Sequence, residues 1–197
     1  MRSLAAALST LVLAACASSP PTHFYMLSAP SAASFTPAAS TEYAIVVGPA
    51  IVPASVDRPQ FVLRLSDNRV ALAEEARWAE PLASAIPETI AADLAQILDS
   101  KRVLAYPETP KDFEYQVLLQ VLRFDSEMGQ AAAVELAWTI RRPNSDEAAD
   151  GRALVREPVK ANGYEALAAA HSRALRSISG DIAKMIRRQA ASHDLRS

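Results

Sequence analysis

The chain has few of the residues from which catalytic and metal-binding sites are usually built. It contains one cysteine, three histidines and five glycines among 197 residues. The histidines are His23, His171 and His193, and neither an HxxxH nor a CxxC spacing occurs, so no metal site is indicated. None of the glycines forms a phosphate-binding loop, and no nucleophile with a base stands out. We therefore predict that the protein is not an enzyme and uses no metal or cofactor.

Three further absences narrow the class of protein. The formal net charge is -2, which disfavours a nucleic-acid partner because such proteins usually carry a clear basic excess. Beyond the first fifteen residues the chain has no apolar run long enough for a transmembrane helix. With a single cysteine it can form no internal disulfide, so its stability must come from packing.

What the chain does have is a short secretory signal that ends at its one cysteine. Arg2 supplies a positive charge, the apolar segment spans 4–13, and Ala14 and Ala15 precede Cys16. The apolar segment is too short to span a bilayer, and small residues before a cysteine are typical of a lipoprotein cleavage site. We predict that residues 1–15 are removed and that Cys16 is acylated. The alternative is an ordinary signal peptide with an incidental cysteine.

Acylation would determine where the protein resides. A diacylglycerol on Cys16, with a further acyl chain on the new amino terminus, gives stable anchoring, since about two chains are needed for it. Residue 17 is Ala, and no Asp follows Cys16 to act as an inner-membrane retention signal. We therefore expect a lipid anchor on the periplasmic face of the outer membrane.

Composition divides the rest of the chain into a tether, one domain and a tail. Residues 16–42 are rich in Ser, Ala and Pro, which is typical of a flexible tether, although Phe24-Tyr25-Met26-Leu27 within them favours a short strand. Residues 43–190 are predicted to form the globular domain, and residues 191–197 a polar tail.

Hydrophobic periodicity within the domain predicts strands and two helices. The strands are expected over 43–52, 60–65, 69–75, 103–107, 113–124, 134–141 and 152–156, with hairpin turns at 66–68, 127–130 and 143–146. The helices are expected over 81–99 and 163–188. The order of these elements predicts an α+β fold: a single two-layer domain with a mainly antiparallel sheet and two helices packed on one face.

Several local details follow from the same patterns. The apolar residues switch faces after Val121, which indicates either a bulge or a second covered surface, and Trp138 is predicted to point into the core. Pro87 is expected to kink the first helix or delay its start. Asn162 and Glu165 have the spacing of a capping box at the start of the second helix.

Two clusters and one histidine are the candidate functional residues. Asp57-Arg58 precedes a strand and forms either a recognition loop or a salt-bridged turn. Glu80 is placed to cap the first helix, and Trp78 beside it is either a core residue or a partner contact. His171 lies on the apolar face of the last helix, which favours a packed side chain with one nitrogen satisfied.

An ordered series of short motifs resembles a known family over almost the whole chain. They are the lipobox at Cys16, Phe24-Tyr25-Met26-Leu27, Val47-Gly48-Pro49, Pro53, Asp57-Arg58-Pro59-Gln60, Trp78-Ala79-Glu80-Pro81-Leu82, Tyr106-Pro107, Trp138, Tyr164-Glu165-Ala166-Leu167 and Ala170-His171-Ser172. The series resembles the paraquat-inducible protein C (PqiC-like) type of ABC-type transport auxiliary lipoprotein. Pro87 departs from the family pattern.

The resemblance implies a docking or receiving module that contributes to membrane integrity. Its partner would be an MCE (mammalian-cell-entry) domain protein that spans the periplasm and connects to an inner-membrane permease and ATPase, moving lipids or other hydrophobic molecules. Asp57, Arg58, Trp78 and Glu80 match family motifs and are candidate partner contacts. Assembly of several copies stays open. The alternatives are an accessory lipoprotein for outer-membrane protein or lipopolysaccharide assembly, and an anchored hydrolase.

Overall fold

The computed structural model describes residues 21–29, 43–143, 145 and 147–194. The predicted signal peptide, Cys16 and most of the predicted tether lie outside them. The elements are β1 (His23–Tyr25), β2 (Ile45–Ile51), β3 (Gln60–Ser66), β4 (Arg69–Trp78), α2 (Leu82–Leu98), β5 (Val103–Ala105), β6 (Tyr115–Glu127), β7 (Ala131–Arg141), β8 (Ala148–Pro158) and α3 (Tyr164–Asp194).

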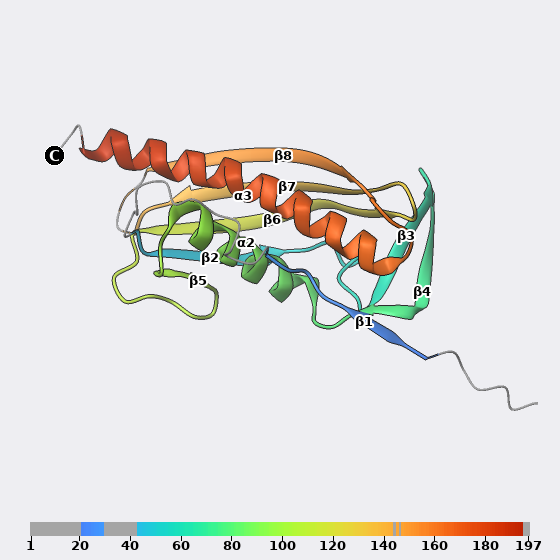
Figure 1. The fold of residues 1–197 in the computed structure, drawn as a ribbon. Helices are drawn as coiled ribbons and strands as arrows, with labels where there is room; N and C mark the ends of the chain where they lie inside the picture. The colour runs from blue at the N-terminus through green and yellow to red at the C-terminus, as the bar shows by residue number, and fades with distance from the viewer. Residues whose placement is uncertain (1–20, 30–42, 144, 146, 195–197) are drawn as a thin grey trace, which may run out of the picture.

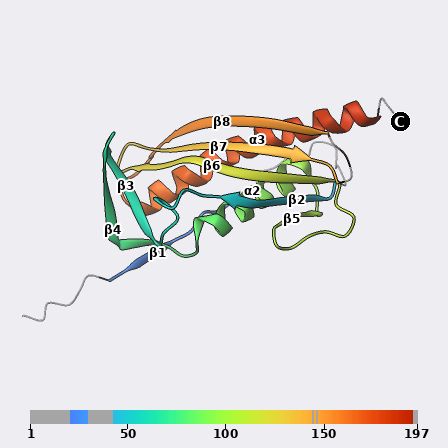
Figure 2. The ribbon, with the colours of Figure 1, turned by 180° about the vertical axis from the view of Figure 1, so that it is seen from behind.

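One eight-stranded sheet carries both helices on the same face, so the predicted two-layer α+β fold is confirmed. Figure 1 shows α2 and α3 in front of the sheet, and the view from behind in Figure 2 shows the strands without a helix over them. β6 is central: β7 pairs with it along its length, while β2 pairs with Tyr115–Gln120 and β3 with Ser126. β8 then pairs with β7.

The prediction of a mainly antiparallel sheet is wrong, because the sheet is mixed. Four of its seven strand pairings are parallel: β1 with β4, β2 with β5, β2 with β6, and β3 with β6. Parallel neighbours require crossover connections, which leave no local turn signal in the sequence. Only the hairpins leave such a signal, and hairpins are antiparallel.

The three predicted hairpins are confirmed. β3–β4, β6–β7 and β7–β8 are antiparallel pairs joined in chain order. The register of β6 against β7 shifts between Val121 and Arg123, so the predicted bulge is present and Phe124 points into the core. The final turn lies partly outside the described residues.

The starts of both helices differ from the sequence predictions. α2 begins at Leu82 and runs through Pro87, so the proline does not delay the helix. α3 begins at Tyr164, and the carbonyl of Gly163 accepts the first helical bond, from the N–H of Leu167. Gly163 therefore occupies the N-cap position, and the predicted capping box with Asn162 is wrong.

The core lies between the sheet and the two helices. Trp138 of β7 is 4% exposed, as predicted, and its indole ring covers Gly151 on β8 so closely that a Cβ there would lie 2.3 Å from Trp138 Cε2. The helices are also joined by a polar contact, since the buried Asp93 of α2 accepts hydrogen bonds from Arg176 (2.6 Å) and Ser179 (3.3 Å) of α3. Burying a carboxylate requires such partners.

Candidate functional site

The four predicted contact residues lie together around one surface hollow, which we call the Trp78 pocket. Its volume is about 530 Å³, and it is lined by Phe24, Asp57, Arg58, Pro59, Arg77, Trp78, Ala79, Glu80 and Pro81. Three segments build it: β1, the loop before β3, and the chain from the end of β4 to the start of α2. The two motifs that stand some twenty positions apart in the sequence therefore form one feature of the surface.

Trp78 forms the floor of this pocket and belongs to the core. The side chain is 5% exposed and stacks on Phe61 with the ring centroids 4.0 Å apart. Its backbone N–H donates to the carbonyl of Pro59 at 2.6 Å, which holds the two motif segments together. The core interpretation of Trp78 is confirmed, and only a small part of its ring reaches the pocket.

Beneath the Trp78 pocket, four motif residues from distant parts of the chain pack with two phenylalanines into an aromatic cluster. It consists of Tyr25, Phe61, Trp78, Phe124, Tyr164 and His171. The hydroxyl of Tyr164 donates to Glu75 at 2.9 Å, and burial together with this carboxylate raises the pKa of Tyr164 to about 12. Much of the motif series therefore supports the fold beneath the pocket.

His171 is a packed residue with one nitrogen satisfied, as predicted. Its ring stacks on Phe124 with centroids 4.0 Å apart, and Nε2 lies 2.8 Å from the Ser126 hydroxyl. Complete burial lowers the pKa of His171 to about 3, so the ring is neutral at physiological pH. A serine beside a neutral histidine has the geometry of a nucleophile and a base, but Ser126 is 3% exposed and His171 is 0% exposed, so a substrate does not reach them.

Asp57, not Glu80, caps the first helix. Asp57 Oδ1 accepts a hydrogen bond from the backbone N–H of Ala83 at 3.4 Å, close to the N-terminus of α2. Pro81 occupies the N-cap position and has no side chain that could accept such a bond. Glu80 is half-buried instead at the rim of the pocket, where desolvation and the neighbouring Glu88 raise its pKa. The predicted capping by Glu80 is therefore wrong.

The two arginines of the pocket keep unused hydrogen-bond donors. Within the described residues no ion pair joins Arg58 to Asp57, so the salt-bridged turn is not formed. The Nε atoms of Arg58 and Arg77 are both shielded and have no hydrogen-bond partner. Arg77 Nη2 lies 3.8 Å from Glu74, a long and exposed contact. The pocket is thus lined by two arginines, Arg58 and Arg77, and by two carboxylates, Asp57 and Glu80.

A second group of motif residues has a structural role away from the Trp78 pocket. Gly48 has φ +101°, and a Cβ there would lie 3.3 Å from Cβ of Pro87. Tyr106 lies beside this contact, and its backbone N–H donates a hydrogen bond to the carbonyl of Val47 at 2.9 Å. Only glycine combines that backbone conformation with such close packing. Pro87 of α2 therefore packs directly against Gly48.

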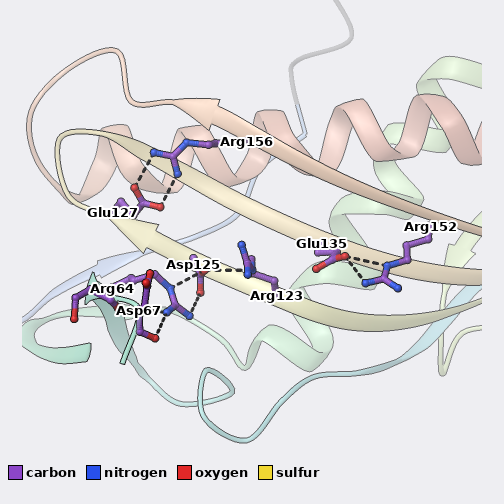
Figure 3. Close-up of polar contacts among 9 residues, drawn as sticks. Arg64, Asp67, Arg123, Asp125, Glu127, Glu135, Arg152 and Arg156 are labelled. Carbon is purple, nitrogen blue, oxygen red and sulfur yellow. Dashed lines mark hydrogen bonds and ion pairs between the residues drawn. The ribbon is translucent and has the colours of Figure 1, made fainter. Parts of the chain in front are cut away.

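The uncovered face of the sheet carries ion pairs that the sequence analysis did not anticipate. Figure 3 shows three groups of them across β3, β6, β7 and β8. Asp125 pairs with Arg64 (2.7 Å) and Arg123 (3.5 Å), and further bridges join Glu135 to Arg152 (2.6 Å) and Glu127 to Arg156 (2.8 Å). Strand register would have revealed these pairs, because alternate residues of paired strands share a face. Each of these four arginines is thus paired with a neighbouring carboxylate.

Over the ranges that the structure describes, no three His, Cys, Asp or Glu side chains are grouped closely enough to hold a metal ion. A search of the same residues finds no helix that is both long and apolar enough to cross a bilayer.

Comparison of the chain with known proteins shows the family to which it belongs. The family model for the ABC-type transport auxiliary lipoprotein component matches residues 25–183. No curated protein matches the chain. A crystal structure of a Xanthomonas campestris protein assigned to the DUF330 family is 18% identical, covers 87% of this chain and 99% of its own, and has a TM-score of 0.70. A crystal structure of an uncharacterized protein is also 18% identical, covers 85% and 99%, and has a TM-score of 0.69. These two crystal structures have the same fold as this chain.

Proposed function

Because this chain belongs to the ABC-type transport auxiliary lipoprotein family, we propose that it is the outer-membrane component of an MCE-type system that moves lipids or other hydrophobic molecules. In this role it is a PqiC-like docking or receiving module on the periplasmic face, anchored through acylated Cys16. It helps to maintain membrane integrity and performs no chemistry of its own.

The observation that carries this proposal is the family match over most of the chain, together with a lipobox a few residues before the match begins. Ser126 and His171 have the arrangement of the nucleophile and base of a hydrolase, but both are buried in the core. What the surface offers is a pocket with arginine donors and apolar walls, which suits recognition more than catalysis.

A crosslinking experiment tests the partner. A photoreactive amino acid placed at Lys184, an exposed residue in the C-terminal part of α3, should crosslink to an MCE-domain protein in the native host. The same residue placed at Leu154 on β8 should give a weaker crosslink or none. Recovery of an outer-membrane barrel protein would favour the alternative role in outer-membrane protein or lipopolysaccharide assembly. Labelling of the purified protein by serine-reactive probes would favour a hydrolase and contradict both the MCE role and the outer-membrane assembly role.

A further inference from the structure

The first described segment of the chain is built into the fold. β1 pairs in parallel with the end of β4, with Phe24 opposite Arg77 and Tyr25 opposite Trp78. Leu27 is 6% exposed within the core. The N–H of Ser28 donates to the hydroxyl of Ser172 on α3 at 3.1 Å. The segment from His23 to Ser28 therefore has a fixed position on the domain.

This fixed position limits how far the domain can stand from its anchor. Seven peptide units connect Cys16 to His23, so even a fully extended chain separates them by roughly 25 Å. If Cys16 is acylated, as the proposed function requires, the β1 end of the domain stays next to the leaflet. Figure 1 shows β1, β3 and β4 at one end of the molecule and the C-terminal end of α3 at the other.

The end of the molecule that carries β1 is also rich in exposed apolar side chains. Of the ten large hydrophobic residues that are exposed in the described part of the chain, five belong to β1, β3, β4 or the residue after β1: Phe24, Met26, Leu65, Val70 and Leu72. Phe24 is 65% exposed and Met26 is 61% exposed. Adjacent apolar side chains with this much exposure are typical of a surface that contacts a membrane or a partner.

Charge beside these apolar residues fits a phospholipid surface. Phe24 and Arg77 are paired in register, so their side chains lie on the same face of the sheet, and Arg58 lines the same pocket. The Arg77 side chain is 37% exposed and Arg58 is half-buried, so part of each arginine lies at the surface, where a guanidinium group matches phosphate oxygens. The pocket also holds the carboxylates of Asp57 and Glu80, and Asp57 accepts a hydrogen bond from the start of α2.

We propose that Phe24, Met26, Arg58 and Arg77 form a bilayer-contact site for the leaflet that carries the anchor. Phe24 and Met26 enter the boundary between headgroups and acyl chains, and Arg58 and Arg77 bind lipid phosphates. The proposal rests on the acylation of Cys16 in the proposed function and adds an orientation to it. The β1 end faces the membrane, and the C-terminal end of α3 projects toward the periplasm.

Depth-dependent fluorescence quenching tests this orientation on the full lipidated chain. Acylation occupies the only native cysteine, so Met26→Cys introduces a single free thiol for a small environment-sensitive fluorophore. Leu154→Cys on β8 is the matched control, because Leu154 is 56% exposed and lies on another strand. In phosphatidylethanolamine–phosphatidylglycerol vesicles, nitroxide-labelled lipids should quench the label at position 26 severalfold more strongly than the label at position 154.

A second variant tests the arginines. Arg58→Gln with Arg77→Gln should reduce quenching at position 26, whereas Lys184→Gln with Arg188→Gln, which removes the same charge from α3, should not. Circular dichroism confirms that each variant is folded. Equal quenching at positions 26 and 154 on vesicle-bound protein would overturn the bilayer-contact site and leave the crosslinking test of the MCE partner unaffected. A chain that fails to float with vesicles would refute the anchor, and with it both proposals.

Discussion

The two faces of the sheet are covered by different kinds of side-chain contact. The helix-covered face buries apolar side chains, an aromatic cluster and the polar side chains of Asp93, His171 and Ser179, which are all 0% exposed. The open face has no helix over it and is crossed instead by arginine–carboxylate pairs whose arginines are 32–64% exposed. Electrostatic interactions strengthen when water is excluded, so side chains on the covered face should dominate stability.

The largest effect is expected for Trp138→Ala on the covered face. The indole fills the space over Gly151, so its removal leaves a cavity beside a residue that has no side chain to occupy it. The free energy of unfolding should fall by about 3–5 kcal/mol. Urea denaturation of the variant measures this, and an unchanged midpoint would contradict the inward position of Trp138.

Asp93→Ala should have the next largest effect. The change removes the acceptor of Arg176 and Ser179 between the two helices, and Ser179 is buried there. We expect a loss of about 1.5–3 kcal/mol, the range for hydrogen bonds to a charged group. Exposed Asp150→Ala on β8, which removes the hydrogen bond from Thr139, is a suitable control for denaturant melts. A loss no greater than that of the control would show that the buried contact adds little.

His171 makes the covered face sensitive to acid. Its pKa is about 3 in the folded protein and about 6.5 when unfolded, so only the unfolded chain takes up the proton between these values. The stability this histidine gives is complete above pH 6.5 and is lost as the pH falls. From well above pH 6.5 down to pH 5 the loss is about 2 kcal/mol. A His171→Gln variant should lose less stability than the parent over this interval, and parallel pH profiles would contradict the assignment.

The smallest effect is expected on the open face. Glu135 and Arg152 form a short contact, but the arginine side chain is 64% exposed. A double-mutant cycle with Glu135→Ala and Arg152→Ala should give a coupling of about 0.2–1 kcal/mol that weakens at high salt. A coupling energy as large as the stability loss expected for Asp93→Ala would show that ion pairs on the open face stabilise the fold as much as the buried contacts do.

Local patterns in the sequence account for the elements and hairpins but not for their assembly. Alternating residues placed β6 and β7, and apolar spacing placed α2 and α3. The parallel partners of β1 and β2 could not be predicted because nothing local marks a crossover.

The Trp78 pocket was predicted in part. Its motif residues were identified one by one, and Trp78 was correctly interpreted as a core residue. Nothing in the sequence marks Phe24 and Arg77 as neighbours of Arg58, because their shared pocket depends on the pairing of β1 with β4. The prediction that Glu80 caps α2 was wrong because the cap, Asp57, comes from a loop far earlier in the chain.

The contact between Trp138 and Gly151 has a consequence for how this sequence can change over time. The cross-strand pair leaves no room at position 151 even for a single methyl group. A larger residue there can be accepted only after the indole opposite has been exchanged for something smaller. We therefore expect positions 138 and 151, which are paired across β7 and β8, to vary together among relatives.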